Sequence, residues 1–140
     1  MSTPILRQNQ GSAITASLSS IANNSYSAGT RVNNSTTAAL LCDVWLTGAF
    51  GTSPAGAGSL QLVVIDRDLS GNAGAAPSTT VIGKVYTLTP SPSGTASQVF
   101  AADSIPLPYD ADFYIYNNGT AYTFTAAASG FVIQPWSPGT

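Results

Sequence analysis

The carboxylates are the side chains with which this sequence could do acid–base chemistry, and all six of them belong to aspartates. The absence of histidine and glutamate removes the serine–histidine–aspartate triad, the usual zinc ligands and the paired glutamates of many glycosidases. Asp110 and Asp112 could form a general acid–base pair. They bracket a proline-rich turn just before a strand, however, where aspartate commonly serves the turn itself. The sequence therefore predicts a protein that is not an enzyme.

A second acidic segment resembles the start of a calcium-binding loop. In residues 66–71, Asp-Arg-Asp-Leu-Ser-Gly, oxygen-bearing side chains alternate and a glycine follows, as a cation held on a sharp turn requires. Pro77 occupies the position at which such loops place a bidentate glutamate, and no helix is predicted on either side. Asp66, Asp68 and Ser70 are thus a weak candidate calcium site, with an aspartate-rich strand end entering a turn as the alternative. The sequence predicts no resident metal or cofactor.

Aromatic side chains offer a third kind of candidate site, because flat rings can stack on the apolar faces of sugars. The aromatic residues considered for such a platform are Trp45, Tyr86, Tyr114, Tyr116, Tyr122 and Trp136. In strands, aromatic residues are more often core residues or cross-strand pairs. A carbohydrate-binding module or a fibre-type receptor-binding domain is therefore kept as an alternative function.

The low charge of the chain limits its partners. Charged residues make up 7% of the 140 residues, where about 25% is typical of a globular domain. The four cations, Arg7, Arg31, Arg67 and Lys84, are scattered, so the sequence predicts no basic patch for nucleic acid. It also has no basic amphipathic helix, and no apolar stretch approaches the roughly 20 residues of a membrane span. We expect a surface that is either neutral or covered by another molecule.

Alternating and β-branched patterns predict strands along most of the chain and no helix. The strand candidates are residues 13–18, 36–50, 59–67, 79–89, 95–101, 112–117, 120–126 and 130–135. About eight strands at this spacing are typical of an antiparallel sandwich or barrel, so the predicted class is all-β. We expect an extended N-terminal arm over 1–12, a single β-sandwich domain over 13–136 and a C-terminal tail over 137–140.

Several of these strands are apolar on both faces. Leu60, Leu62 and Val64 alternate with Val63 and Ile65 in the segment 59–67. An antiparallel sandwich normally packs one face of each sheet on the core and leaves the other in water. A second cover is therefore expected, either from the long loops of the chain itself or from a partner, and the sequence leaves these two alternatives open.

In whole-chain style the sequence resembles the capsid decoration, or cement, proteins of tailed bacteriophages, and most closely the jelly-roll cement proteins of podophages. The resemblance is carried by the start at 13–18, the long strand at 37–50 and a closing hairpin at 112–120, with Asn-Asn-Gly at its turn. It implies a jelly-roll sandwich that forms homodimers or homotrimers. It also implies a structural virion protein, made in the host cytoplasm, that clamps major capsid protein subunits together from outside the shell.

The two ends of the chain are the expected contact elements, because each carries apolar anchors in an otherwise polar segment. At the N-terminus these residues are Pro4, Ile5, Leu6 and Arg7, and at the C-terminus the anchor is Trp136. An extended arm can add a strand to the sheet edge of a neighbour, which gives main-chain hydrogen bonds without large side chains.

Overall fold

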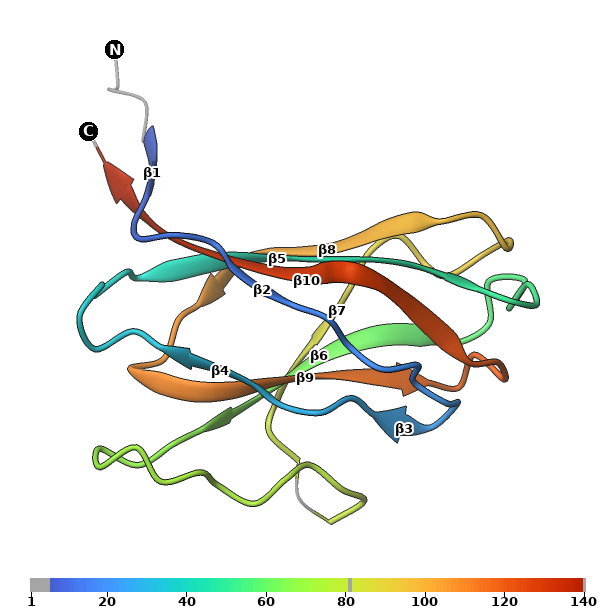
Figure 1. Ribbon diagram of the computed structural model, residues 1–140, viewed down its shortest axis with the longest axis horizontal. Helices are drawn as coiled ribbons and strands as arrows, with labels where there is room; N and C mark the ends of the chain where they lie inside the picture. The colour runs from blue at the N-terminus through green and yellow to red at the C-terminus, as the bar shows by residue number, and fades with distance from the viewer. Residues whose placement is uncertain (1–5, 81, 140) are drawn as a thin grey trace.

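The computed structural model describes residues 6–80 and 82–139, and within these ranges it contains strands, turns and loops but no helix. The strands form two antiparallel sheets that pack face to face (Figure 1). The strand bounds are β1 (Leu6–Asn9), β2 (Ile14–Ala16), β3 (Ser25–Tyr26), β4 (Thr30–Asn33), β5 (Leu41–Phe50), β6 (Ser59–Asp66), β7 (Lys84–Thr87), β8 (Gln98–Pro106), β9 (Asp110–Asn118) and β10 (Phe124–Gly139).

The order of the strands is that of a jelly roll. The first sheet runs β1-β10-β5-β8, with β2 also paired to β10, and the second runs β3-β9-β6-β7, with β4 also paired to β9. After β4 the chain changes sheet at every connection except the one from β6 to β7. This alternation builds the double Greek key that defines the fold. The predicted all-β, jelly-roll-like antiparallel sandwich is confirmed.

The core lies between the two sheets and consists of the inward-facing residues of the long strands. These residues include Val44, Leu46, Phe50, Leu60, Leu62, Phe100, Phe113, Ile115, Phe124, Phe131 and Ile133. The ring of Phe124 lies 5.2 Å from that of Phe50 and 5.9 Å from that of Phe100, centroid to centroid. Cys42 is buried here, and desolvation raises the pKa of its thiol to about 12. Its sulfur is therefore protonated and unreactive in the folded protein.

The predicted hairpin at 112–120 is wrong. β9 lies in one sheet and β10 in the other, so the Asn-Asn-Gly turn carries the chain across the sandwich instead of reversing it within a sheet. The reason is the buried side chain of Asn117, whose amide donates to the carbonyl oxygens of Ile21 (3.0 Å) and Tyr122 (2.8 Å). These bonds fix the chain at a corner of the sandwich, and the two strand candidates that follow become the single long strand β10.

The strands that are apolar on both faces are covered in part by the chain itself. Val63, on the outer face of β6, is buried, and its neighbour Ile65 lies against Gly74 of the long β6–β7 loop. On β9, the ring of Tyr114 lies against Gly29. For these residues the second cover is intramolecular, which was one of the two alternatives.

Candidate interaction site

The two ends of the chain pair with each other to form a short two-stranded ribbon. Leu6–Asn9 runs antiparallel to Trp136–Gly139, with Leu6 opposite Gly139 and Asn9 opposite Trp136. We call these eight residues the terminal ribbon; it projects from one end of the sandwich (Figure 1). The predicted contact elements Leu6, Arg7 and Trp136 are thus brought together. Pro4 and Ile5 lie outside the described residues.

In the part of the chain that the structure describes, no strand pairs with the outer edge of the terminal ribbon. The N–H of Gln10 donates to the carbonyl of Pro135 at 3.0 Å, so these two residues form a hydrogen-bonded pair of the antiparallel ladder. Because hydrogen-bonded and non-bonded positions alternate in an antiparallel pair, the main-chain N–H and C=O groups of Arg7 and Asn9 point away from β10. All four residues of β1 are exposed, so these groups are available to a further strand.

Arg7 anchors the base of the terminal ribbon to the sandwich. Its guanidinium lies 5.7 Å from the ring centroid of Trp45 on β5 and 5.6 Å from that of Trp136 on β10. Its Nη1 also forms an ion pair with Oδ2 of Asp43. A guanidinium over an aromatic ring is attracted by the negative face of the ring, so Arg7 is held by two rings and one carboxylate.

Asp43 is the centre of this anchor, and no pattern in the sequence indicates its role. Only 4% of the residue is exposed, and its Oδ1 accepts hydrogen bonds from the indole Nε1–H of Trp136 and the main-chain N–H of Ser104, both at 2.9 Å. Asp43 sits at a β-bulge, where the β5–β8 register shifts between Cys42 and Val44. Ser104 opposite it has a φ of 55°, so the bulge aims its N–H at the carboxylate.

The acid–base candidates Asp110 and Asp112 are each paired with an arginine. Arg31 donates from Nε (3.0 Å) and Nη2 (2.7 Å) to the two oxygens of Asp110, and Arg67 donates from Nη2 to Asp112 at 2.9 Å. The hydrogen bonds from Arg31 are the main reason that the pKa of the Asp110 carboxyl is lowered. These carboxylates therefore fasten strands and loops to one another.

The three calcium-loop candidates do not converge on one point. Asp66 is paired with the amine of Lys84 at 3.2 Å. Asp68 instead accepts hydrogen bonds from the main-chain N–H groups of Ser70 (2.9 Å) and Asn72 (2.8 Å) and from the Asn72 side chain (2.8 Å). These bonds, above all the one from the Asn72 side chain, lower the pKa of Asp68. Among the described residues, no cluster of three or more His, Cys, Asp or Glu side chains could hold a metal ion.

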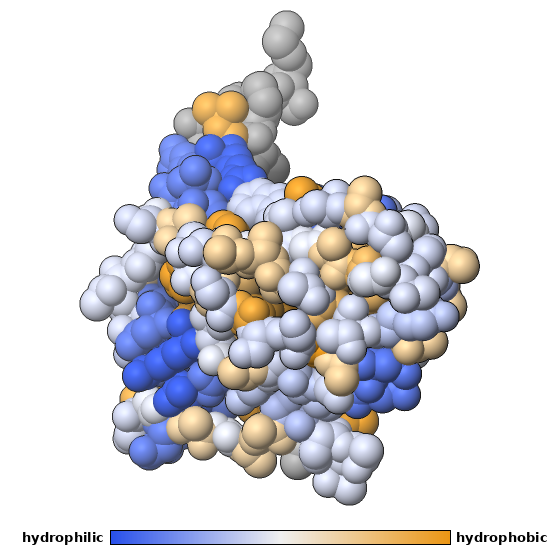
Figure 2. Space-filling model, turned by 45° about the vertical axis from the view of Figure 1, so that its right-hand side comes forward, coloured by the Kyte–Doolittle hydropathy of each residue, from blue (hydrophilic) through white to orange (hydrophobic). Residues whose placement is uncertain are grey.

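Every lysine and arginine of the chain is neutralised by an aspartate of the same chain. The pairs are Arg7–Asp43, Arg31–Asp110, Arg67–Asp112 and Lys84–Asp66. On the face drawn in Figure 2, residues of intermediate hydropathy predominate and strongly hydrophilic residues are confined to patches. This surface therefore presents main-chain groups and apolar side chains more than unpaired positive charge.

Three of the aromatic candidates have partners within the chain. Tyr116 stacks on Tyr26, with ring centroids 4.3 Å apart and planes inclined by 20°, so each ring covers a face of the other. Trp45 and Trp136 both contact the guanidinium of Arg7. These rings serve as cross-strand and cation–π partners, which is the structural use that aromatic residues commonly have in strands.

No helix among the described residues is long and apolar enough to cross a membrane. No family model, curated protein sequence or solved structure matches the chain.

Proposed function

We propose that this chain is a capsid decoration, or cement, protein of a tailed-phage head, which binds the outer surface of the shell and stabilises contacts between major capsid protein subunits. The whole-chain resemblance supplies the class of protein. Within that class the jelly-roll sandwich and the small number of charged residues suit a protein that adheres to a shell, because adhesion needs broad complementary area and no reactive pocket.

The terminal ribbon is the observation that carries the proposal. An isolated two-stranded ribbon is marginally stable in water, yet this one projects from the body with its outer edge open. A strand of a major capsid subunit placed along β1 would satisfy the N–H and C=O groups of Arg7 and Asn9. Leu6 on the same strand is an exposed apolar side chain that such a contact would cover.

Asn9 allows a matched pair of variants to test this contact. Its N–H faces the open edge, so Asn9→Pro removes a donor for an added strand while it leaves the β1–β10 hydrogen bonds in place. Asn9→Ala is the control, because it changes the side chain and keeps the donor. Purified variants are added to phage heads that lack the decoration protein, and occupancy is measured by co-sedimentation.

We expect Asn9→Pro to lower occupancy at least about tenfold, which corresponds to about 1.4 kcal/mol of binding free energy. Asn9→Ala should bind like the unchanged chain. Deletion of residues 1–8 should abolish binding, and full occupancy by that truncated chain would remove the terminal ribbon from the proposal. Absence of binding by the unchanged chain to heads of any maturation state would contradict the proposed function as a whole.

A further inference from the structure

The Asn-Asn-Gly turn that carries the chain across the sandwich contains a self-reactive pair of residues. Asn118 is the only asparagine of the sequence that glycine follows. Such a pair can rearrange without an enzyme, because glycine has no side chain to shield its main-chain nitrogen from the preceding amide group. Asn118 is the last residue of β9, and Gly119 is exposed, with a φ of +68°. The two reacting groups therefore lie at the surface of the sandwich.

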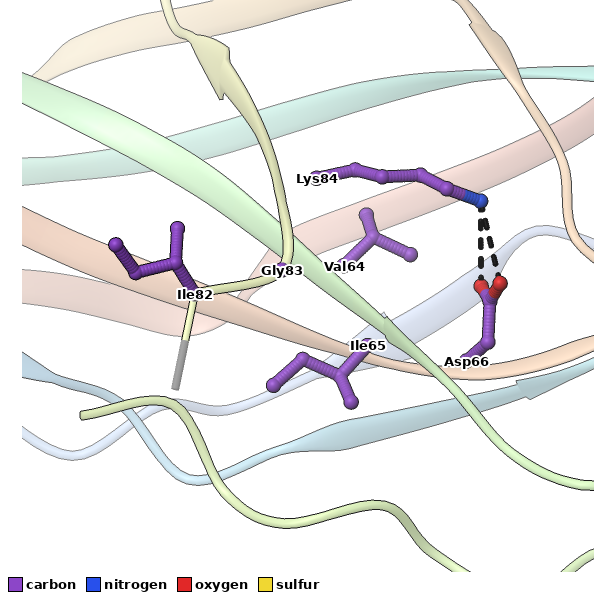
Figure 3. Close-up of a pocket in the computed structure, with 6 residues that line it drawn as sticks. All are labelled: Val64, Ile65, Asp66, Ile82, Gly83 and Lys84. Atoms are coloured by element: carbon purple, nitrogen blue, oxygen red, sulfur yellow. Dashed lines mark hydrogen bonds and ion pairs between the residues drawn. The ribbon is translucent and has the colours of Figure 1, made fainter. Parts of the chain in front are cut away.

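The two ends of β6 hold different polar groups. Where β6 ends, Asp66 pairs with the amine of Lys84 at 3.2 Å beside a hollow of about 380 Å³ (Figure 3). The other residues that line this hollow are Val64, Ile65, Ile82 and Gly83. Where β6 begins, Ser59 is paired with Asn118, whose side chain forms no hydrogen bond within the described part of the chain. Of these two ends, the one where β6 begins therefore holds the unpartnered polar side chain.

The N–H of Gly119 is held by the side chain of Asn24. It donates to Oδ1 of Asn24 at 3.0 Å. The main chain of Asn24 is itself fixed, because its N–H donates to the carbonyl of Asn117 at 2.7 Å. The neighbouring Asn23 accepts a hydrogen bond from the N–H of Ala121, also at 3.0 Å. The two asparagine-rich turns are therefore interlocked, and the nitrogen that could react takes part in the interlock.

We propose that Asn118 is a self-modification site, which deamidates when this corner of the sandwich opens, and that Asn24 controls the rate. The main-chain nitrogen of Gly119 attacks Cγ of Asn118, a bond forms between these two atoms, and the bond from Cγ to Nδ2 breaks. Nδ2 leaves as ammonia with the proton that the Gly119 nitrogen gives up. Solvent water then opens the succinimide ring at Cγ, which gives aspartate, or at the main-chain carbonyl carbon, which gives isoaspartate.

The folded structure opposes this reaction in two ways. The nitrogen attacks after losing its proton, and a hydrogen bond to the protonated group disfavours that loss. Ring closure also requires Asn118 to leave its extended conformation, which its pairing with Ser59 resists. The reaction therefore proceeds from locally opened molecules, and its rate follows their population. Removal of one hydrogen bond should raise that population about two- to tenfold.

Modification changes the corner as well as its charge. Either product adds a negative charge at residue 118, and isoaspartate also lengthens the main chain by a methylene group. The corner is tightly packed, since a Cβ atom on Gly58 would collide with the carbonyl of Asn118 and with the main chain of Gly119 and Thr120. Isoaspartate at this position should therefore lower the stability of the chain.

Peptide mass spectrometry of the folded full chain, incubated at mildly alkaline pH, measures the rate of deamidation at Asn118. We expect Asn24→Gly, which removes the acceptor and suits the φ of 57° there, to raise this rate at least about threefold. Asn23→Ala is the matched control, because it removes the acceptor of Ala121 and leaves the bond from Gly119 to Asn24 in place. Its rate should stay within about twofold of that of the unchanged chain.

Internal references separate opening of the corner from loss of the fold. Deamidation at Asn34 and Asn72 in the same samples reports global unfolding, and Asn24→Gly should leave it unchanged. In guanidinium chloride, the unchanged chain should deamidate at Asn118 at least about tenfold faster than it does when folded. Asn118→Gln should abolish the modification, because a longer side chain closes a less favourable ring.

Two results would overturn the proposal. One is an equal rate at Asn118 in Asn24→Gly and in either the unchanged chain or Asn23→Ala, which would remove Asn24 from the account. The other is an equal rate in the folded and the unfolded chain, which would show that the interlocked turns give no protection. Neither result depends on head binding, which tests the proposed function separately.

Discussion

The indole N–H of Trp136 donates to Oδ1 of Asp43 at 2.9 Å and so ties the last strand of the chain to a bulge in β5. The other oxygen of the same carboxylate pairs with Arg7 on the first strand. One buried aspartate thus holds both strands of the terminal ribbon at the point where they leave the sandwich. The direction in which the ribbon projects is set by this carboxylate.

We expect Asp43→Ala to destabilise the protein by about 2–4 kcal/mol, because it leaves Arg7, Trp136 and the N–H of Ser104 without their acceptor. This loss of stability is smaller than the loss expected on breaking a fully buried ion pair, because Arg7 is partly exposed. Urea denaturation followed by tryptophan fluorescence measures the change. Asp103→Ala, at an exposed carboxylate, is the control and should change stability by less than about 0.5 kcal/mol. Equal effects of the two variants would contradict this role of Asp43.

Acid should weaken the fold through the Arg31–Asp110 pair. The folded-state pKa of Asp110 is lowered, chiefly by hydrogen bonds from Arg31, so the unfolded chain binds this proton more tightly than the folded chain. The stabilisation is complete above the unfolded-state pKa of about 4 and is lost as pH falls through the lowered folded-state pKa. We expect the free energy of unfolding to fall more steeply below pH 4 in the unchanged chain than in Arg31→Gln. Parallel pH curves, measured by urea denaturation, would show that the pair contributes nothing.

Two glycines in the β5–β6 loop allow the energetic cost of a strained backbone to be compared with that of a steric clash. Gly56 and Gly58 both have positive φ, +79° and +68°, but open space surrounds Gly56, whereas a Cβ at Gly58 would collide with the carbonyl of Asn118. Gly56→Ala should cost about 1–2 kcal/mol from the backbone conformation alone. Gly58→Ala should cost about 1–3 kcal/mol more because the loop must move. Thermal denaturation checks that Gly58→Ala lowers stability more than Gly56→Ala does. A larger loss for Gly56→Ala would contradict the predicted collision between residue 58 and Asn118.

Binding to heads should depend little on salt. All four cations are already paired within the chain, so an interface built on main-chain and apolar contacts releases few ions and is weakly screened. We expect the dissociation constant for heads to change by less than about threefold between 50 and 500 mM NaCl. A tenfold or larger weakening would mean that ion pairs with the shell, and not the open edge of β1, provide most of the affinity.

The fold could be predicted from the sequence because its signals are local. The alternating segments at 59–67 and 112–117 became β6 and β9 almost unchanged, since a period of two identifies a strand wherever that strand finally pairs. The hairpin predicted at the Asn-Asn-Gly turn was wrong because turn residues indicate where the chain bends and not which strand the following segment pairs with. The buried side chain of Asn117 holds the corner at which the chain crosses to the other sheet, and its partners lie outside the turn motif.

The candidate site could be predicted only in part. Its members were recognised singly, as apolar anchors at the two ends, but their pairing joins the beginning of the chain to its end and no local pattern encodes it. Asp43 could not be singled out, because its partner Arg7 is 36 residues away and its burial follows from a bulge. The arginine partners of Asp110 and Asp112 were likewise invisible, since they depend on the register of β4 and β6 against β9.

The pairing of Leu6 with Gly139 has a practical consequence for rearranging the chain. A short linker between these neighbouring positions, with new ends opened in the exposed loop at 51–58, gives a circular permutant that retains every strand of the sandwich. In that permutant the longest-range pairing of the natural order becomes a local hairpin, and its loop-closure cost almost disappears.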